Sequence, residues 1–242
     1  MNWTEKKLKQ IPLRNGFRLR GLEMTRLETF TDAAFAFATT LLVVSVGSIP
    51  VSYAELVLAL KGIPAFAASF ASIMYFWIGH RQWSRRYGLE DGKSIFISLC
   101  LIFIMLVYVY PLKIIFSALF AWISGGWLPV SFAIETLQEF LNVFIIYGIG
   151  YAALAAMIAL LYLHALKLKD QLCLNALEHV KTKKEIVSFV VFTGTGLTSA
   201  AIAWLAPPPI AVFAGFAYST LALTMPFVAI FYAKKEEKIF EK

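Results

Sequence analysis

The most constraining feature of this sequence is a series of apolar stretches, each close to the length that a membrane-crossing helix needs. Roughly 20 apolar residues in a helix cross the hydrocarbon core of a bilayer. The chain of 242 residues is 60% hydrophobic and only 15% charged, which is too little charge for the surface of a soluble domain. We therefore predict an all-α, polytopic membrane protein with six transmembrane helices. The expected spans are 27–49, 63–83, 94 to at least 111, 137–163, 186–205 and a sixth that follows Pro207–Pro209 and ends near Tyr232.

The segments between these spans differ in character. Tyr53–Lys61 is too short to cross a membrane, so we expect it to lie at the interface. Two tryptophans, two glycines and a proline in residues 122–129 predict a turn at the interface, where tryptophan is favoured. Residues 84–93 and 167–185 are polar, and we expect them to be loops.

Lysine and arginine are distributed very unevenly along the chain. Twenty of the 22 fall in segments that six alternating spans place on one side of the membrane, and only Lys61 and Lys113 fall on the other. Because cytoplasmic loops carry the excess of Lys and Arg, this pattern predicts that both termini are cytoplasmic, an N-in/C-in arrangement. The net charge of +7 is then explained by topology, and nucleic acid is not an expected partner.

We divide the chain into a basic cytoplasmic amino-terminal segment (1–25), a six-helix transmembrane domain (26–233) and a charged cytoplasmic tail (234–242). In the amino-terminal segment Leu8, Ile11, Leu13 and Phe17 alternate with basic residues. This pattern is typical of an amphipathic segment on anionic lipid headgroups, and equally of a solvated basic flank.

No motif for catalysis, metal binding or a cofactor is present in the sequence. HExxH, GxSxG and paired intramembrane carboxylates are absent, so we expect neither an enzyme nor a cofactor. Cys100 and Cys173 lie in or beside apolar segments without CxxC spacing, which predicts ordinary buried thiols.

The first span carries the main polar anomaly. Asp32 lies several residues inside an apolar helix, where a carboxylate is costly unless it faces protein, water or a partner charge. Helical spacing gives this span two notable faces. One carries bulky residues and the other is smaller and suited to close helix contact. The first comprises Phe30, Ala34, Phe37, Leu41, Val44 and Ser48, and the second comprises Ala33, Ala36, Thr40, Val43 and Gly47. On spacing alone, a stripe of bulky apolar residues is more typical of contact with lipid or with the protein core than of a pore lining.

The second span offers a partner for Asp32. Trp77 and His80 are three residues apart and share a helical face, and His80 lies about level with Asp32 if both helices cross fully. A buried histidine bonded to a carboxylate is a reasonable pair. The alternative is that both residues belong to the interfacial belt.

At these residues the sequence resembles the endolysosomal potassium-channel family of the transmembrane protein 175 type, and especially its short bacterial members. The family's first helix opens with Arg-x-x-x-Phe-Ser-Asp and continues with alternating Phe and Ala. Arg26, Phe30, Thr31 and Asp32 match the opening, FAFATTLLVV follows at 35–44, and Trp77 and His80 resemble the Trp-x-x-His of the second helix.

The resemblance implies a homotetrameric cation channel, permeable to potassium, in the cell membrane of a bacterium. It also implies a hydrophobic gate, in which large side chains of four first helices surround a central pore. By position these fall on Phe37, Leu41 and Val44, with Thr40 beside them. Arg26, Phe30, Thr31, Asp32, Trp77 and His80 would hold the pore helices together.

This sequence departs from the family pattern in three places. Thr31 replaces a serine, Ala33 replaces a frequent glycine, and Phe37 replaces an aliphatic residue at a constriction. Four phenyl rings around one axis would either seal the pore or change how it gates.

Two further features remain open from the sequence. Glu135 and Glu139 share a helical face near the outer start of the fourth span, and they either concentrate cations at the external mouth or belong to a solvated helix start. The alternative function is a secondary transporter or proton-coupled carrier that uses Asp32. Glycine pairs at Gly148–Gly150 and Gly194–Gly196 would then mark helix breaks.

Overall fold

Six helices of the computed structural model are long and apolar enough to cross a membrane, within the residues that are described. The structure describes the whole chain except residues 1–2, 4, 45–48, 131 and 241–242. This confirms the predicted all-α architecture with six spans. The spanning elements are α2 (Arg26–Val44), α4 (Ile63–Tyr87), α5 (Gly92–Ile123), α6 (Leu137–Lys167), α7 (Ala176–Leu205), and the 3-10 helix η1 (Ala214–Thr220) continued by α9 (Leu221–Phe240).

Five short elements connect or precede the spans. They are α1 (Glu5–Gln10), β1 (Leu13–Arg14), β2 (Phe17–Arg18), α3 (Tyr53–Lys61) and α8 (Pro208–Ala211). The helix α3 has the bounds expected for the interfacial segment, and Ser52 starts it by accepting a hydrogen bond from the backbone N–H of Glu55.

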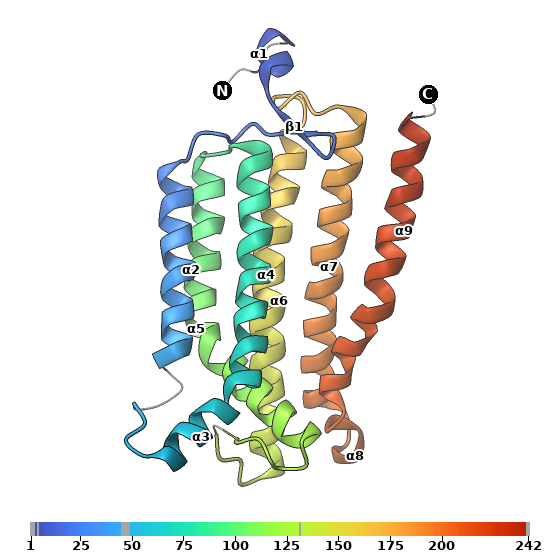
Figure 1. Cartoon of the computed structure of the whole chain (residues 1–242). Coiled ribbons are helices and arrows are strands. Elements are labelled where there is room, and N and C mark those ends of the chain that lie inside the picture. Colours follow the sequence, from blue (N-terminus) through green and yellow to red (C-terminus); the bar gives the residue numbers. More distant parts are fainter. Residues whose placement is uncertain (1–2, 4, 45–48, 131, 241–242) are drawn as a thin grey trace.

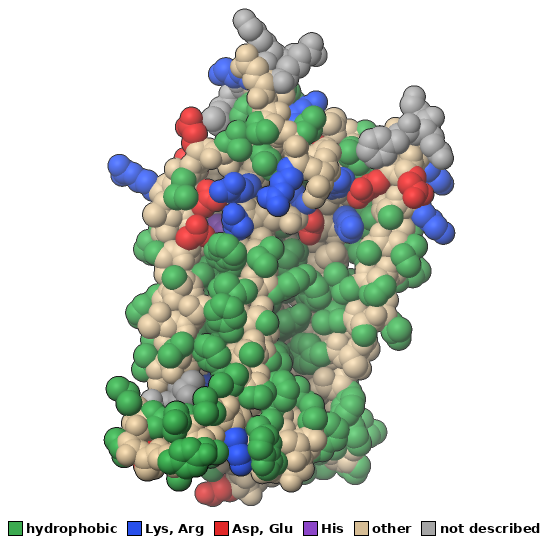
Figure 2. Space-filling model, viewed as in Figure 1, with side chains coloured by type: hydrophobic (Ala, Val, Ile, Leu, Met, Phe, Trp, Pro, Cys, Tyr) green, Lys and Arg blue, Asp and Glu red, His purple; other side chains and the backbone are tan. Residues whose placement is uncertain are grey.

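The spanning helices run side by side, and both termini lie at the same end of the bundle (Figure 1). Blue side chains of Lys and Arg gather at that end, and a broad band of hydrophobic side chains covers the helices beyond it (Figure 2). Alanine, serine, tyrosine and large apolar residues form the interior. The largest fully buried side chains include Trp83, Tyr87 and Tyr162.

The third span is longer than its expected minimum. The helix α5 continues through Pro111 to Ile123, and Figure 1 shows it changing direction in its lower half. Gly125 and Gly126, with φ of 63° and 87°, then form the expected turn. These positive angles favour glycine, and the N–H of Gly126 reaches back to the carbonyl of Ala121 across 2.8 Å.

The fifth helix begins earlier than expected. Hydropathy predicts a polar loop for residues 176–185, but they form the first turns of α7. Asn175 accepts a hydrogen bond from the N–H of Glu178, and the Glu178 carboxylate accepts one from the N–H of Asn175. This capping box fixes the helix start ten residues before the apolar run. The last helix likewise continues past Tyr232 to Phe240, through most of the charged tail.

The helices α6 and α7 make the most extensive contact of the bundle. They meet at glycines: a Cβ added at Gly148 would lie 2.7 Å from the carbonyl oxygen of Gly196, and the converse distance is also 2.7 Å. Both helices run unbroken through these positions. The expectation that these glycines mark breaks is therefore wrong, because they serve close helix packing instead.

The amino-terminal segment folds onto the end of the bundle. Its strands β1 and β2 pair antiparallel around Asn15 and Gly16, whose φ values of 53° and 73° are those of a two-residue hairpin turn. Phe17 is 1% exposed and packs edge-on against Tyr87 of α4, with ring centroids 5.5 Å apart. At Phe17 the segment is thus neither a solvated flank nor a lipid-facing helix.

Arg20 fastens this segment to the start of α7. Its guanidinium donates to both carboxylate oxygens of Glu178, at 3.1 and 2.8 Å, and both side chains are fully buried. The Nε of Arg20 donates to the carbonyl of Leu172 at 2.9 Å. All three contacts are the charge-assisted kind that a buried arginine requires.

The cysteine prediction is only partly correct. Cys173 is exposed in the turn between α6 and α7, and Cys100 is half-buried in α5. Cys173 has a φ of 47°, so its position in a tight turn keeps it at the surface. The two lie on different elements and form no disulfide.

Candidate functional site

The first spanning helix, α2, is buried along one narrow face. Phe35, Ala38 and Leu42 are at most 1% exposed and face α4 and α5, and Glu28 and Thr31 continue this face toward the basic end. These residues recur at steps of three and four, as one side of a helix must. Spacing alone does not single out this face, because apolar residues surround the helix on all sides.

Most of the predicted constriction lies on the opposite side of α2. Phe37 is 56% and Val44 is 67% exposed, and Thr40 is also exposed. Leu41 differs, because it is partly buried and packs against the edge of the core. The exposed side also carries Ala33 and Ala36, which are small. Ser48 and Gly47, at the far end of the two predicted faces, lie outside the described residues.

The threonine hydroxyls of this helix have partners within it. Thr40 Oγ1 donates to the carbonyl oxygen of Ala36 at 3.1 Å, and Thr39 Oγ1 donates to the same oxygen at 2.8 Å. Thr31, buried on the other face, donates to the carbonyl of Leu27 at 2.8 Å. A hydroxyl bonded in this way has its donor satisfied within the helix and can therefore lie in an apolar environment.

Asp32 and Trp77 are brought together. The indole N–H of Trp77 donates to Asp32 Oδ1 across 2.7 Å and joins α4 to α2. The guanidinium of Arg81 lies over the Trp77 ring, 5.1 Å from its centroid. The carboxylate inside the first span therefore has a specific donor from the second span.

His80 does not pair with Asp32 as expected. Its Nε2 lies 3.0 Å from the hydroxyl of Ser98 on α5, and the side chain is buried. Trp77 and His80 lie on neighbouring turns of α4, but Trp77 contacts α2 whereas His80 contacts α5. The sequence gives no indication of Ser98, since an isolated serine in an apolar span carries no distinguishing signal.

The remaining motif residues lie apart from this contact. Arg26 and Phe30 are exposed, and in the described part of the chain the Arg26 side chain makes no hydrogen bond or ion pair. Glu28, between them, is buried and lies 3.9 Å from Arg85 Nε of α4. A second charged link between α2 and α4 thus comes from Glu28.

Glu135 and Glu139 are exposed at the end of the bundle opposite the termini. Glu139 Oε2 accepts a hydrogen bond from the N–H of Glu135, and the Glu139 N–H donates to the hydroxyl of Thr136, the N-cap residue of α6. Their first role is therefore to begin a helix. Among the described residues, no cluster of three or more metal-binding side chains is present.

Known proteins resemble this chain in both sequence and structure. The model of the family described as endosomal/lysosomal potassium channel TMEM175 matches residues 26–111. A potassium channel from Marivirga tractuosa is 34% identical over 203 residues, which cover 81% of each chain. The crystal structure of a threonine-to-alanine variant of the potassium channel MtTMEM175, in complex with a nanobody–MBP fusion protein, matches with a TM-score of 0.78 and 31% identity, over 94% of this chain and 100% of that one.

Proposed function

Because this chain belongs to the TMEM175 potassium-channel family, it is a multi-pass membrane channel protein rather than an enzyme, and we propose that it conducts potassium through a pore lined by α2 of four copies. The relatives named above are potassium channels, which supports monovalent cations as the permeant species. We place the protein in a bacterial cell membrane with its basic end in the cytoplasm, in accord with the excess of Lys and Arg at that end.

The observation that carries the pore proposal is the unpartnered side of α2. Phe37, Thr40 and Val44 lie directly opposite the face that packs on the chain's own helices. Ala33 and Ala36 on the same side permit close approach of another helix, whereas contact with lipid gives no reason for small residues there. A symmetric assembly around this side of α2 would turn these side chains toward one axis.

Such a pore closes by excluding water. Rings formed by Phe37, Leu41 and Val44 are apolar, and slight narrowing is enough to dewet an apolar constriction. Thr40, whose hydroxyl donates to the carbonyl oxygen of Ala36 in the same helix, adds a weakly polar ring between them. Because Leu41 packs partly on the core, a rotation of α2 is needed to bring it fully toward the axis. Since this rotation would narrow the pore with a further apolar ring, we propose it as part of closing and its reverse as part of opening.

The proposal is tested by ion flux into reconstituted vesicles. Phe37→Ser and Leu41→Ser should each raise the leak of potassium, because a hydroxyl hydrates a constriction that is otherwise dry. Phe227→Ser is the matched control, since Phe227 is 71% exposed on α9, the span with the least burial. If the Phe37 and Leu41 variants both leave flux unchanged, the pore is not lined by this side of α2.

Two further measurements bear on the assembly and the ion. Mass measurement of the detergent-solubilised protein should give four chains, and a monomer would contradict a shared pore. Flux with potassium compared with sodium gives the selectivity.

We also propose that Glu135 and Glu139 add negative charge at the external mouth of the pore. Replacing both by Gln should then lower conductance only at low salt, where this charge is least screened.

A carrier that uses Asp32 lacks its main structural support. It would need interrupted helices, but α6 and α7 pass through their glycines without a break. Asp32 itself is held by the indole of Trp77.

A further inference from the structure

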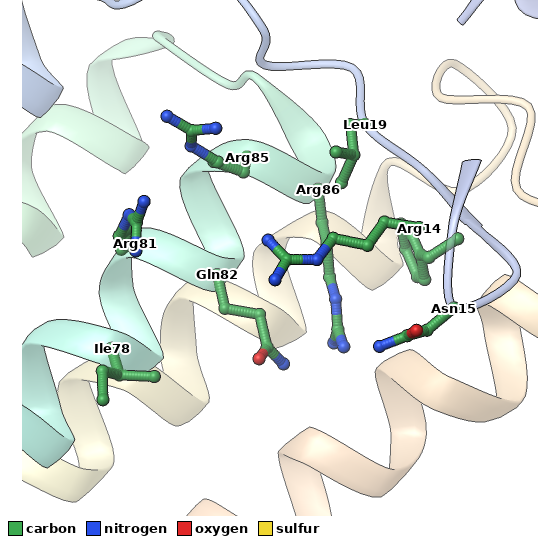
Figure 3. Close-up of a pocket in the computed structure, with 9 residues that line it drawn as sticks. Arg14, Asn15, Leu19, Ile78, Arg81, Gln82, Arg85 and Arg86 are labelled. Atoms are coloured by element: carbon green, nitrogen blue, oxygen red, sulfur yellow. The ribbon is translucent and has the colours of Figure 1, made fainter. Parts of the chain in front are cut away.

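A basic pocket of about 240 Å³ lies between the amino-terminal hairpin and α4, at the end of the bundle that holds the termini. Figure 3 shows Arg14 and Asn15 entering it from the hairpin, and Gln82 and Arg86 entering it from α4, with their polar ends directed toward one space. Arg81 and Arg85, one position before Gln82 and Arg86 respectively, also line it from α4. Among the described residues, no Asp or Glu lines this pocket.

The positive charge of the pocket is only half compensated. Arg86 pairs with Glu185 of α7 at 3.0 Å, and Arg85 lies 3.9 Å from Glu28. For Arg14 and Arg81, the described part of the chain supplies no carboxylate within ion-pair distance. An anion bound here would thus meet two guanidiniums that have no carboxylate within ion-pair distance, of which that of Arg81 also lies over the Trp77 ring.

The pocket lies at the boundary between the charged end and the apolar band. Along α4, Tyr75, Ile78, Arg81 and Arg85 share one face at three- and four-residue steps. Ile78 is 52% and Tyr75 is 44% exposed, although both lie in a membrane-spanning helix. The Tyr75 ring packs edge-on against Phe192 of α7, with centroids 5.4 Å apart. The surface just beyond the pocket is therefore apolar, and Figure 2 shows hydrophobic side chains directly below the basic ones.

From this arrangement we propose that the pocket binds the phosphate of an anionic phospholipid from the cytoplasmic leaflet. Arg14 and Arg81 contact the phosphate, and the amide of Asn15 binds a neighbouring headgroup oxygen, because the amide nitrogen of Gln82 already donates to Glu185 at 2.6 Å. One acyl chain lies along Ile78 and Tyr75 of α4. A soluble phosphate would fill the basic part but would leave this exposed apolar stripe without a role, whereas a lipid occupies both. The site is separate from the exposed side of α2, so it does not depend on which ion the channel conducts.

The test is native mass spectrometry of the full-length protein during titration with phosphatidylglycerol. The wild type should bind this lipid in preference to phosphatidylcholine, whose choline cancels the phosphate charge. Arg14→Gln combined with Arg81→Gln should weaken phosphatidylglycerol binding about 30-fold, since each of the two basic residues at a membrane surface contributes on the order of 1 kcal/mol. Arg85 and Arg86 are left unchanged, because both already face a carboxylate of the protein.

The control removes the same charge outside the pocket. Lys234→Gln combined with Lys238→Gln lies at the same end of the bundle on α9 and should leave lipid binding unchanged. Equal weakening by both pairs would show that only diffuse surface charge attracts the lipid, and would overturn the proposal. No weakening by the arginine pair would do the same.

A second arm separates the lipid from a free anion. Glycerol phosphate at the concentration of the lipid should not displace it, because it has no acyl chain to lie along α4. If it does displace the lipid, the occupant is a soluble phosphate and the lipid assignment is wrong. Arg14→Gln alone, on the exposed hairpin, provides the same readout in a variant whose fold depends least on the change.

Discussion

The indole N–H of Trp77 and the carboxylate of Asp32 lie 2.7 Å apart, and this bond joins the second span to the helix proposed to line the pore. Asp32 is seven residues into α2, where an unpaired carboxylate would be costly. The bond therefore fixes how α2 lies against α4. Any rotation of α2 during opening must either keep this contact or break it.

Trp77→Phe should destabilise the protein, because it keeps the aromatic ring and removes the only donor that the indole offers to Asp32. The expected loss is about 1–3 kcal/mol in the free energy of unfolding, typical of a partly buried group left without its hydrogen bond. Chemical denaturation in detergent measures it. Trp204→Phe, at a position that is 77% exposed on α7, is the control and should have little effect. Equal stability of the Trp77 variant and the wild type would show that this hydrogen bond does not stabilise the fold.

Asp32→Asn separates a packing role from a proton-carrying role. The amide oxygen of asparagine can still accept from Trp77, so the fold should survive while the negative charge is lost. We expect potassium flux of the same order as that of the wild type. Abolished flux in a correctly assembled Asp32→Asn protein would instead favour the carrier.

Glu178→Gln should be among the most destabilising single changes at the basic end. It leaves the fully buried guanidinium of Arg20 without its counter-charge, and breaking such a pair costs roughly 3–5 kcal/mol. The partly exposed pair of Lys181 and Glu236, 3.6 Å apart, serves as the comparison. Glu236→Gln should cost no more than about 1 kcal/mol in the same denaturation experiment. Similar costs for both would show that Arg20 finds another partner.

Gly148→Ala and Gly196→Ala should each loosen the contact between α6 and α7. A methyl group at either position would lie 2.7 Å from a backbone oxygen of the other helix, and backbone cannot move aside as a flexible side chain can. We expect a loss of about 1–3 kcal/mol in the free energy of unfolding. Gly194→Ala meets nothing within 4 Å and should instead stabilise the helix, by up to about 1 kcal/mol. The opposite order of stabilities would contradict this close packing of the two helices.

Labelling of Cys173 tests the orientation in the membrane. Cys173 is exposed at the basic end, and Cys100 lies inside a spanning helix. In a Cys100→Ser background, a membrane-impermeant thiol reagent should modify Cys173 in inverted vesicles and spare it in intact cells. A chain with Glu135→Cys as its only thiol should behave in the opposite way. Labelling of Cys173 from outside the cell would reverse the proposed orientation.

The spans were predictable because hydropathy reports where a chain meets hydrocarbon. Hydropathy does not report where a helix begins or ends, so it predicts a loop where α7 forms its polar first turns from Ala176 onward. The capping box of Asn175 and Glu178 is visible in the sequence and indicates the correct start. Asn15 and Gly16 likewise carry the signature of a hairpin turn.

The site was only partly predictable. The spacing of Phe37 and Val44 places them on one side of α2, but it does not show which side the neighbouring helices cover. In a helix that is apolar all round, burial is decided by the neighbours. The same limit applies to His80, whose partner Ser98 lies on a third helix.

The pairing of Arg20 with Glu178 also constrains the order in which the protein is made. The two residues are 158 positions apart, so translation of the start of α7 must precede closure of the hairpin over the bundle. The four spans α2, α4, α5 and α6 precede Glu178 in the chain, so all four are synthesised before Arg20 can form this ion pair. A chain that ended after α6 would contain four of the spanning helices but would lack Glu178, and with it the ion pair that ties the amino-terminal segment to α7. The amino-terminal segment is therefore synthesised first, but it can reach its final position on the bundle only after the start of α7 has been made.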